Sequence, residues 1–176
     1  MTKMVATFRA ELADREAIRD CLMRYSRGID RRDPELLRTV YWPDASDEHL
    51  DFVGTGDAFI DYVIPLLSTM DQTMHLLGNV LIDIEGDDAR VETYFQAFHR
   101  LRLDGEQRRD FEAAGRYVDR FARRNDEWRI AHRVVIIDWF RAHPDSADWS
   151  NGVLGNRTDP GGHKPGDRSY ALLSRG

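Results

Sequence analysis

The period of the hydrophobic pattern changes once along the chain, and this change limits the fold classes open to it. In the N-terminal part, apolar side chains recur at helical spacing: Ile18, Leu22, Tyr25 and Ile29 follow one another at steps of four, three and four. From Thr73 to Phe140 the apolar side chains follow the alternating pattern of extended strands. Helices followed by a run of strands predict an α+β domain, with the helices packed on one face of a curved antiparallel sheet.

Capping and breaking residues divide the helical part. Asp14 is a candidate N-cap for the first helix, and Asp33, followed by proline, is a candidate N-cap for the second. A third helix is expected over residues 59–67, with a kink or a late start because Pro65 lies within it. The acidic and then glycine-containing stretch 44–56 is expected to form a short edge strand or a loop.

Turn signals divide the second part into four long strands. They occur at residues 85–88, 104–105 and 125–127. In the first of these strands, simple alternation assigns side chains to two faces. One face carries Met74, Leu76, Val80, Ile82 and Ile84, and the other carries His75, Leu77, Asn79, Leu81 and Asp83.

The composition changes again after residue 143. Residues 1–143 are long enough for one domain with a sizeable core and a ligand pocket. Residues 144–176 hold six of the 13 glycines and three of the six prolines, and are expected to form an irregular tail. The apolar end of the tail, residues 170–173, could dock over the pocket mouth or on a neighbouring subunit, or the tail could be disordered.

The charge balance excludes some classes of partner. The chain has 31 acidic and 25 basic residues, so its net charge of -6 does not fit a generic nucleic-acid binder. It contains no apolar run long enough for a membrane span, and its first residues lack the apolar core of a secretory signal. Cys21 is the only cysteine, which leaves no intramolecular disulfide or cysteine-based zinc site. The expected location is therefore the cytoplasm.

The candidate catalytic residues come from the end of the first helix and the start of the first long strand. His75 lies among apolar neighbours, where burial would keep its imidazole neutral and fit it for general base catalysis. Asp30 could fix the tautomer of His75; the alternative is a structural core histidine. Tyr25 lies five residues before Asp30, roughly 140° away around an ideal helix, so both reach one pocket only if the helix ends or unwinds near Gly28.

Neither a metal nor a cofactor is expected. The six histidines are scattered, and none pairs with another at helical i, i+4 spacing. The acidic residues between 44 and 51 could hold a hard cation, but a solvated acidic loop is the simpler interpretation.

Three segments together resemble the SnoaL-like branch of the nuclear transport factor 2-like superfamily. They are RYSRGIDRRD, LLRTVYWPDA and TMHLLGN, and the resemblance covers roughly residues 10–141. It implies a cystatin-like α+β cone with a deep pocket between helices and sheet. Tyr25, Asp30 and His75 match the active-site pattern of the bile acid 7-alpha dehydratases. The last two also match the Asp-His pair of hexachlorocyclohexane dehydrochlorinase, and scytalone dehydratase is a more distant analogue.

The resemblance implies a lyase or isomerase that needs no cofactor and acts on a small, apolar, cyclic substrate of steroid, polyketide or aromatic origin. In this interpretation His75 abstracts a proton, Asp30 orients His75 and Tyr25 donates a hydrogen bond. Expected substrate-binding residues are Asn79, His99, Tyr117 and His132. The alternative is a non-catalytic ligand-binding module, or a small subunit of a larger enzyme such as a ring-hydroxylating dioxygenase. The family also implies a homodimer or homotrimer formed through the outer face of the sheet.

Overall fold

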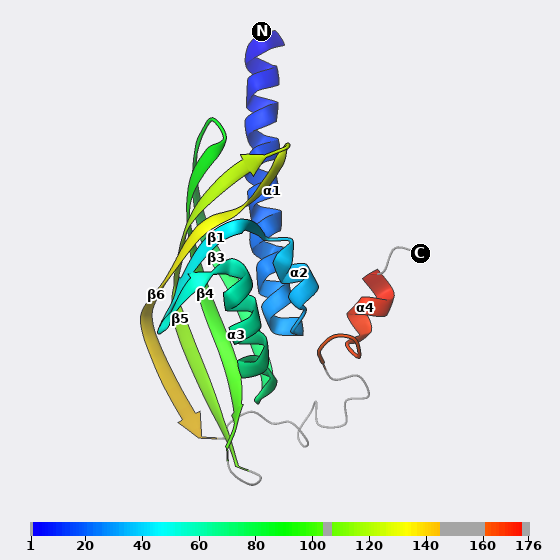
Figure 1. Cartoon of the computed structure of the whole chain (residues 1–176), viewed down its shortest axis with the longest axis vertical. Helices are drawn as coiled ribbons and strands as arrows, with labels where there is room; N and C mark the ends of the chain where they lie inside the picture. Colours follow the sequence, from blue (N-terminus) through cyan, green and yellow to red (C-terminus); the bar gives the residue numbers. More distant parts are fainter. Residues whose placement is uncertain (1, 104–106, 145–160, 174–176) are drawn as a thin grey trace.

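The computed structural model describes residues 2–103, 107–144 and 161–173 of the chain (Figure 1). It confirms the predicted α+β class, with N-terminal helices packed on a strongly curved sheet. The helices are α1 (Thr2–Arg31), α2 (Pro34–Arg38), α3 (Gly56–Ser68) and α4 (Arg168–Leu173). No helix within the described ranges is both long enough and apolar enough to cross a lipid bilayer.

One sheet of six strands forms the other layer. Its strands are β1 (Tyr41–His49), β2 (Phe52–Thr55), β3 (Met70–Glu85), β4 (Asp88–Arg102), β5 (Arg108–Arg124) and β6 (Glu127–Pro144). Their order is β2-β1-β6-β5-β4-β3, so β3 is an edge strand. Strands β3 to β6 form the predicted antiparallel meander, while β1 pairs in parallel with β6.

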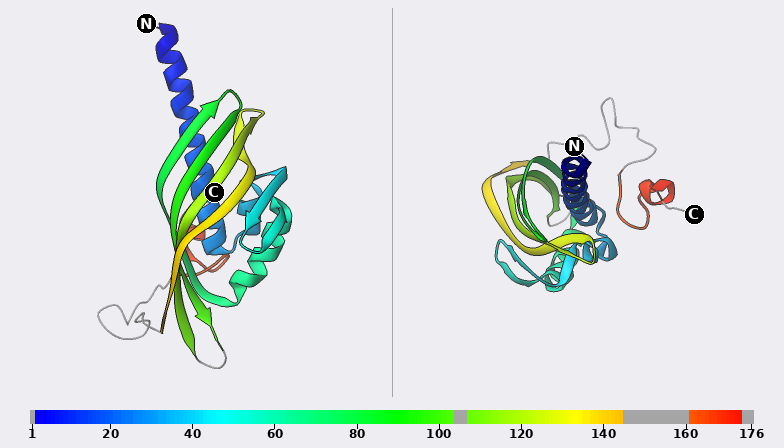
Figure 2. Two further views of the ribbon diagram at one scale, coloured as in Figure 1. Left: turned by 90° about the vertical axis from the view of Figure 1, so that its left-hand side faces the viewer. Right: turned by 90° about the horizontal axis from the view of Figure 1, so that it is seen from above.

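The sheet wraps around α1 and α3, as the end-on view of Figure 2 shows. Shifts of register between β5 and β6, which increase local twist, occur beside Gly115 and beside Phe121. A Cβ at Gly115 would lie 2.0 Å from the carbonyl oxygen of Ile136, so only glycine permits this close approach of the two strands. The resulting concave face encloses the core.

Helix α1 begins earlier than predicted. Asp14 lies within it, and its carboxylate accepts hydrogen bonds from the Trp128 indole at 2.8 Å and from Arg123 at 3.2 Å instead of capping a helix. The N-terminal turns of α1 extend past the sheet (Figure 2). The predicted apolar stripe is confirmed: Ile18, Leu22, Tyr25 and Ile29 are all buried, each at most 3% exposed.

The segment between α2 and α3 is more ordered than a loop. Residues 41–49 form β1 and residues 52–55 form β2, and β1 begins at Tyr41, whose side chain is buried in the core. Helix α3 begins at Gly56 with the Thr55 hydroxyl accepting its cap hydrogen bond from the Ala58 N–H at 3.2 Å. Pro65 lies inside α3, which continues to Ser68.

The simple alternation expected for β3 is wrong for half of the strand. A register shift between Leu77 and Val80 inserts an extra residue relative to β4. His75 and Leu77 therefore face inward together with Val80 and Ile82, whereas Asn79 is exposed. Before the extra residue the odd-numbered side chains face inward, and after it the even-numbered ones do. A prediction from simple alternation assumes no such change.

The described part of the C-terminal tail contains a regular element, contrary to the expectation of an irregular tail throughout. Residues 168–173 form α4, beside α1 and α2 (Figure 1). The helix starts after Asp167, whose carboxylate accepts the Ser169 N–H at 3.0 Å, as an N-cap does. Leu172 and Leu173 remain exposed. Residues 145–160, on which the rest of this expectation depends, lie outside the described residues.

Candidate active site

A cavity of about 570 Å³ lies between the concave face of the sheet and helices α1 and α3. Its volume is typical of sites for small organic ligands. The lining is mainly apolar and aromatic, and includes Tyr25, Ile29, Phe59, Val63, Phe95 and Tyr117. Three histidines, His49, His75 and His99, also line it.

The Asp30 carboxylate holds His75 at two points. One oxygen lies 2.7 Å from Nδ1 of the imidazole, and the other accepts the backbone N–H of His75 at 2.9 Å. This N–H is on the edge strand β3, and Asp30 of α1 gives it the partner that a further strand would otherwise provide. The two side chains are only 9% and 10% exposed, so water competes little for these contacts.

These contacts determine which imidazole nitrogen faces the cavity. Burial alone would raise the pKa of Asp30, but the hydrogen bonds and charge interaction with His75 hold it below its usual value. An ionised Asp30 accepts the proton on Nδ1, which leaves the lone pair on Nε2. Because His75 lines the cavity and Asp30 does not, Nε2 is the nitrogen that a ligand can meet.

The structure brings Tyr25 and His75 into one cavity without unwinding α1. The helix runs unbroken to Arg31, and Gly28 instead allows close packing, because a Cβ there would lie 2.7 Å from the Leu37 side chain. Tyr25 lines the cavity directly, whereas Asp30 lies behind His75. The helix does not end or unwind near Gly28, and in keeping with the expected condition Tyr25 and Asp30 do not both reach the cavity: Asp30 contacts His75 from outside it.

A buried ion pair that the sequence interpretation missed supports the cavity wall. Arg133 of β6 and Asp119 of β5 are directly opposed across the two strands and joined by two hydrogen bonds of 2.7 Å, with both side chains fully buried. The guanidinium carbon lies 4.0 Å from the ring centre of Tyr25 and 4.2 Å from that of Tyr117. The sequence contained one sign of this buried ion pair: Asp119 lies between Tyr117 and Phe121 on the same face of a strand, so an inward-facing carboxylate could have been predicted.

Two further imidazoles face the cavity. His99, an expected substrate contact, lies edge-on to His75 with ring centres 5.4 Å apart. His49, which was not predicted, stacks on Phe59 with ring centres 4.7 Å apart. Burial lowers the pKa of His99 to about 4 and that of His49 to about 3, so both are neutral at neutral pH.

Two of the expected substrate contacts lie elsewhere. Asn79 is exposed in the register shift of β3. His132 lies on the opposite face of the sheet from Arg133, where its Nδ1 is 2.7 Å from the Ser46 hydroxyl. Neither lines the cavity, whereas Tyr117 and His99 do.

The acidic residues of β1 have separate partners. Asp44 binds Arg124 at 2.7 Å, and Asp47 is buried with the Tyr41 hydroxyl donating to it at 2.6 Å. Burial raises the pKa of Asp47 to about 6, against the effect of Arg133. Among residues 2–103, 107–144 and 161–173, no three histidine, cysteine, aspartate or glutamate side chains are grouped as metal ligands.

The fold and the paired Asp30 and His75 define a class: cystatin-like α+β cones that enclose a small-molecule cavity. The model of the SnoaL-like domain family matches residues 10–134, and the chain belongs to this family. An uncharacterized protein of Mycobacterium tuberculosis, Rv2910c, is 29% identical over 128 residues, which cover 71% of this chain and 86% of that protein.

Several solved structures share the fold. A type 2 hexachlorocyclohexane dehydrochlorinase, LinA, is 21% identical with a TM-score of 0.69, covering 77% of this chain and 93% of the other. A protein of Novosphingobium aromaticivorans provisionally named scytalone dehydratase is 22% identical with a TM-score of 0.69. The match covers 80% of this chain and 94% of that protein. A Nostoc punctiforme protein described as having a cystatin-like fold is 18% identical with a TM-score of 0.60. The match covers 72% of this chain and 92% of that protein.

Proposed function

We propose that this protein is a lyase of the dehydratase type, or an isomerase, that needs no cofactor and acts on a small, apolar, uncharged cyclic molecule. The observation that carries the proposal is the 2.7 Å contact between Asp30 and Nδ1 of His75, with the imidazole on the wall of an apolar cavity. A structural core histidine would need neither a buried carboxylate on its ring nor an open cavity beside it.

His75 is the general base in this proposal. Its Nε2 takes a proton from a carbon acidified by a neighbouring carbonyl, and Asp30 stabilises the imidazolium that forms. Such base catalysis accelerates reactions typically ~10²–10⁴-fold. Loss of a leaving group from the adjacent carbon completes an elimination, whereas return of the proton to another carbon completes an isomerisation.

Tyr25 is the proposed hydrogen-bond donor to the developing charge. Burial raises the pKa of Tyr25 more than the positive charge of the nearby Arg133 lowers it. The phenol therefore stays protonated through the neutral range. A protonated phenol on the cavity wall can donate to the substrate carbonyl or to a leaving hydroxyl.

The charges around the cavity support an uncharged substrate. Asp51 is the one residue with a formally charged side chain among the described lining residues, which include neither lysine nor arginine. The imidazoles of His49 and His99 are neutral, so they can hydrogen-bond to an oxygen without adding charge. A substrate with a carboxylate or phosphate inside the cavity would lack a counterion there.

The names of two structural neighbours, a dehydrochlorinase and a scytalone dehydratase, support elimination chemistry. Because sequence identity to both is low, they establish the fold, and the reaction rests on the cavity and the histidine. The alternative, a non-catalytic ligand-binding module, would need the cavity but would not need a general base.

The proposal is tested with His75→Gln, which keeps roughly the volume of the side chain and removes the base. A panel of cyclic β-hydroxy ketones and enones is screened with the wild type for elimination, hydration and solvent deuterium exchange at the acidic carbon. We expect His75→Gln to lose at least ~10²-fold in exchange rate. The matched control is His132→Gln, on a strand but outside the cavity, which should keep the wild-type rate. Turnover by His75→Gln at the wild-type rate would rule out His75 as the base.

A further inference from the structure

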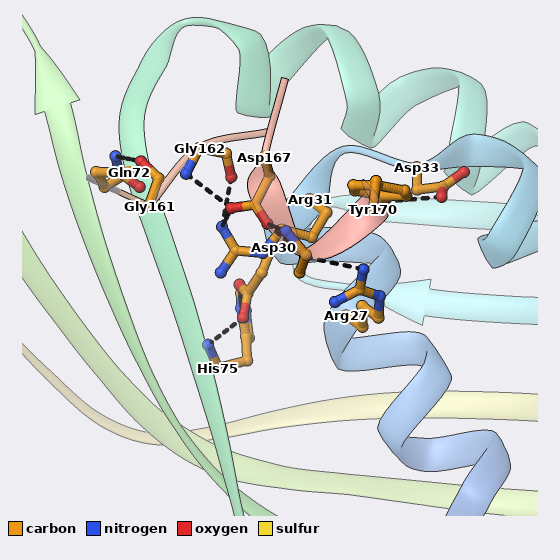
Figure 3. Close-up of polar contacts among 11 residues, drawn as sticks. Arg27, Asp30, Arg31, Asp33, Gln72, His75, Gly161, Gly162, Asp167 and Tyr170 are labelled. Carbon is orange, nitrogen blue, oxygen red and sulfur yellow. Dashed lines mark hydrogen bonds and ion pairs between the residues drawn. The ribbon is translucent and has the colours of Figure 1, made fainter. Parts of the chain in front are cut away.

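The described part of the C-terminal tail, residues 161–173, packs against the end of α1 that carries Asp30. The backbone N–H of Lys164 donates to the carbonyl oxygen of Arg31 at 2.9 Å, and the Arg31 guanidinium donates to the carbonyl of Gly162 at 2.5 Å. In Figure 3 this segment approaches the last turn of α1 from one side, while His75 approaches Asp30 from the other. We call residues 161–173 the C-terminal clamp.

The clamp also contacts the neighbours of α1. On β3, the side-chain amide of Gln72 donates to the Gly161 carbonyl at 3.0 Å, three residues before His75. Beyond α1, Asp33 accepts hydrogen bonds from the Lys164 ammonium and the Tyr170 hydroxyl, both at 2.9 Å. The clamp therefore connects the two elements whose separation sets the distance between Asp30 and His75.

Asp167 holds the clamp in shape. Its carboxylate accepts the backbone N–H groups of Gly162 at 2.9 Å and of Ser169 at 3.0 Å, together with the Ser169 hydroxyl. It also lies 3.6 Å from the Arg31 guanidinium. Hydrogen bonds from Ser169 and Gly162 lower the pKa of Asp167 to about 2, so its charge is present throughout the physiological range.

The end of α1 needs such support. The last carbonyl groups of a helix have no partner within it and the terminal turn frays, so an outside donor such as the Lys164 N–H holds it. The helix stops at Arg32, which has a φ of 51°, a left-handed conformation that residues with a Cβ seldom adopt. Asp30 lies two residues before this point, so fraying of the turn would move its carboxylate.

We propose that the C-terminal clamp positions the catalytic pair, and that Asp167 and Lys164 are positioning residues for Asp30. None of the described clamp residues lines the cavity, so their effect passes through α1. The clamp lies beyond residues 10–134, the part of the chain that matches the SnoaL-like family. The proposal rests on the proposed function only in calling the pair catalytic.

The test compares Asp167→Ala with Asp167→Asn in the full-length protein. The alanine variant removes the acceptors for both Gly162 and Ser169, whereas asparagine keeps one acceptor oxygen and presents its NH₂ group at the place of the other. Two NMR signals report the position of Asp30 without substrate: hydrogen exchange at the His75 backbone N–H, and the far-downfield resonance of the His75 Nδ1 proton. The control is Asp44→Ala, which breaks a surface ion pair with Arg124.

In Asp167→Ala we expect exchange at the His75 N–H to speed up by about tenfold or more and the Nδ1 proton signal to broaden or disappear, because the last turn of α1 opens locally. Asp167→Asn should give an intermediate effect on both signals, because it keeps one of the two acceptors, and Asp44→Ala should leave them unchanged. Once a substrate is known, Asp167→Ala should lower kcat with little change in KM.

Native proteolysis shows whether the clamp has detached. If it detaches in Asp167→Ala while both His75 signals stay as in the wild type, the clamp does not position the pair and the proposal is overturned. If the alanine variant stays docked, the double variant Lys164→Gln/Asp167→Ala is measured, and unchanged signals there overturn it as well. Because both signals are read without turnover, a failure of the proposed reaction is a separate result.

Discussion

At the scale of single residues, the two oxygens of Asp30 have different tasks. One accepts the Nδ1 proton of His75 and sets the tautomer, and the other accepts the backbone N–H and fixes the strand. A carboxylate does both without donating a proton, whereas an amide in the same place presents an NH₂ group to one of the two sites.

Asp30→Asn should therefore have a large effect on the reaction rate. The amide can favour the wrong tautomer of His75, and a comparable change in a serine protease triad lowers kcat about 10⁴-fold. We expect a loss of similar order, measured as the rate of deuterium exchange or elimination. Tyr25→Phe serves as comparison, with an expected loss of at most roughly 3–4 kcal/mol of transition-state stabilisation. Equal rates for Asp30→Asn and the wild type would contradict the orienting role.

The sequence pointed to Tyr25, Asp30 and His75 as candidates mainly through its resemblance to the SnoaL-like family, and their catalytic role stays a prediction. It was not enough to show that Asp30 acts from behind the edge strand, because that depends on how α1 crosses β3. Nor did it reveal His49, whose inward direction follows from the pairing of β1 with β6. Such pairings bring together residues far apart in the chain, and a local pattern does not record them.

At the scale of elements, the β5–β6 pair carries two ion pairs of the same type in different surroundings. Arg133 and Asp119 are fully buried on the inner face, whereas Arg116 and Asp138 are partly exposed to solvent. Both pairs form two hydrogen bonds between the side chains. The two pairs differ in burial and in one further contact, because Arg116 also donates a hydrogen bond to Glu92 at 3.2 Å.

Asp119→Ala should destabilise the protein by ~3–5 kcal/mol, because it leaves the Arg133 guanidinium buried without its counterion. Asp138→Ala, the control on the exposed pair, should cost at most ~1 kcal/mol, since water can solvate Arg116 and Glu92 still binds it. Unfolding by urea, followed by tryptophan fluorescence, measures both free energies. A loss below 1 kcal/mol for Asp119→Ala would show that the buried pair contributes little.

Most elements followed from the period of the hydrophobic pattern, and the exceptions have local physical causes. Thr2–Arg31 is one helix because Asp14 finds partners on β5 and β6 instead of capping a new start. Within residues 44–56, where the sequence left an edge strand and a loop open, strands form because β6 offers a parallel edge to β1. In both places a contact made by a distant segment outweighs the local signal.

At the scale of the whole molecule, the outer face of the sheet carries exposed apolar side chains. Met74, Leu76 and Leu81 of β3 are each at least 60% exposed, Tyr94 lies on the adjacent strand β4, and Trp139 lies farther along the sheet on β6. Apolar surface gathered in this way often marks a protein interface. The expectation of a homodimer or homotrimer through this face stays a prediction.

Light scattering coupled to size-exclusion chromatography should give the mass of two or three chains at micromolar concentration. Leu76→Lys should shift the mass toward one chain, because it places a charge in the apolar face. Val53→Lys, an exposed substitution on β2, is the control and should leave the mass unchanged. A wild-type mass of one chain would contradict the prediction.

The register shift in β3 also has a consequence for how the length of this family's chains can vary. Three residue steps on β3, from Leu77 to Val80, match two on β4, from Phe95 to Thr93. Removing Asn79 would therefore give a regular ladder in which His75 still faces the cavity and Ile82 still faces the core. A deletion elsewhere in the strand would turn one of its halves outward. We expect homologous chains that are one residue shorter here to have the gap at residue 78 or 79, with the histidine preserved in its place.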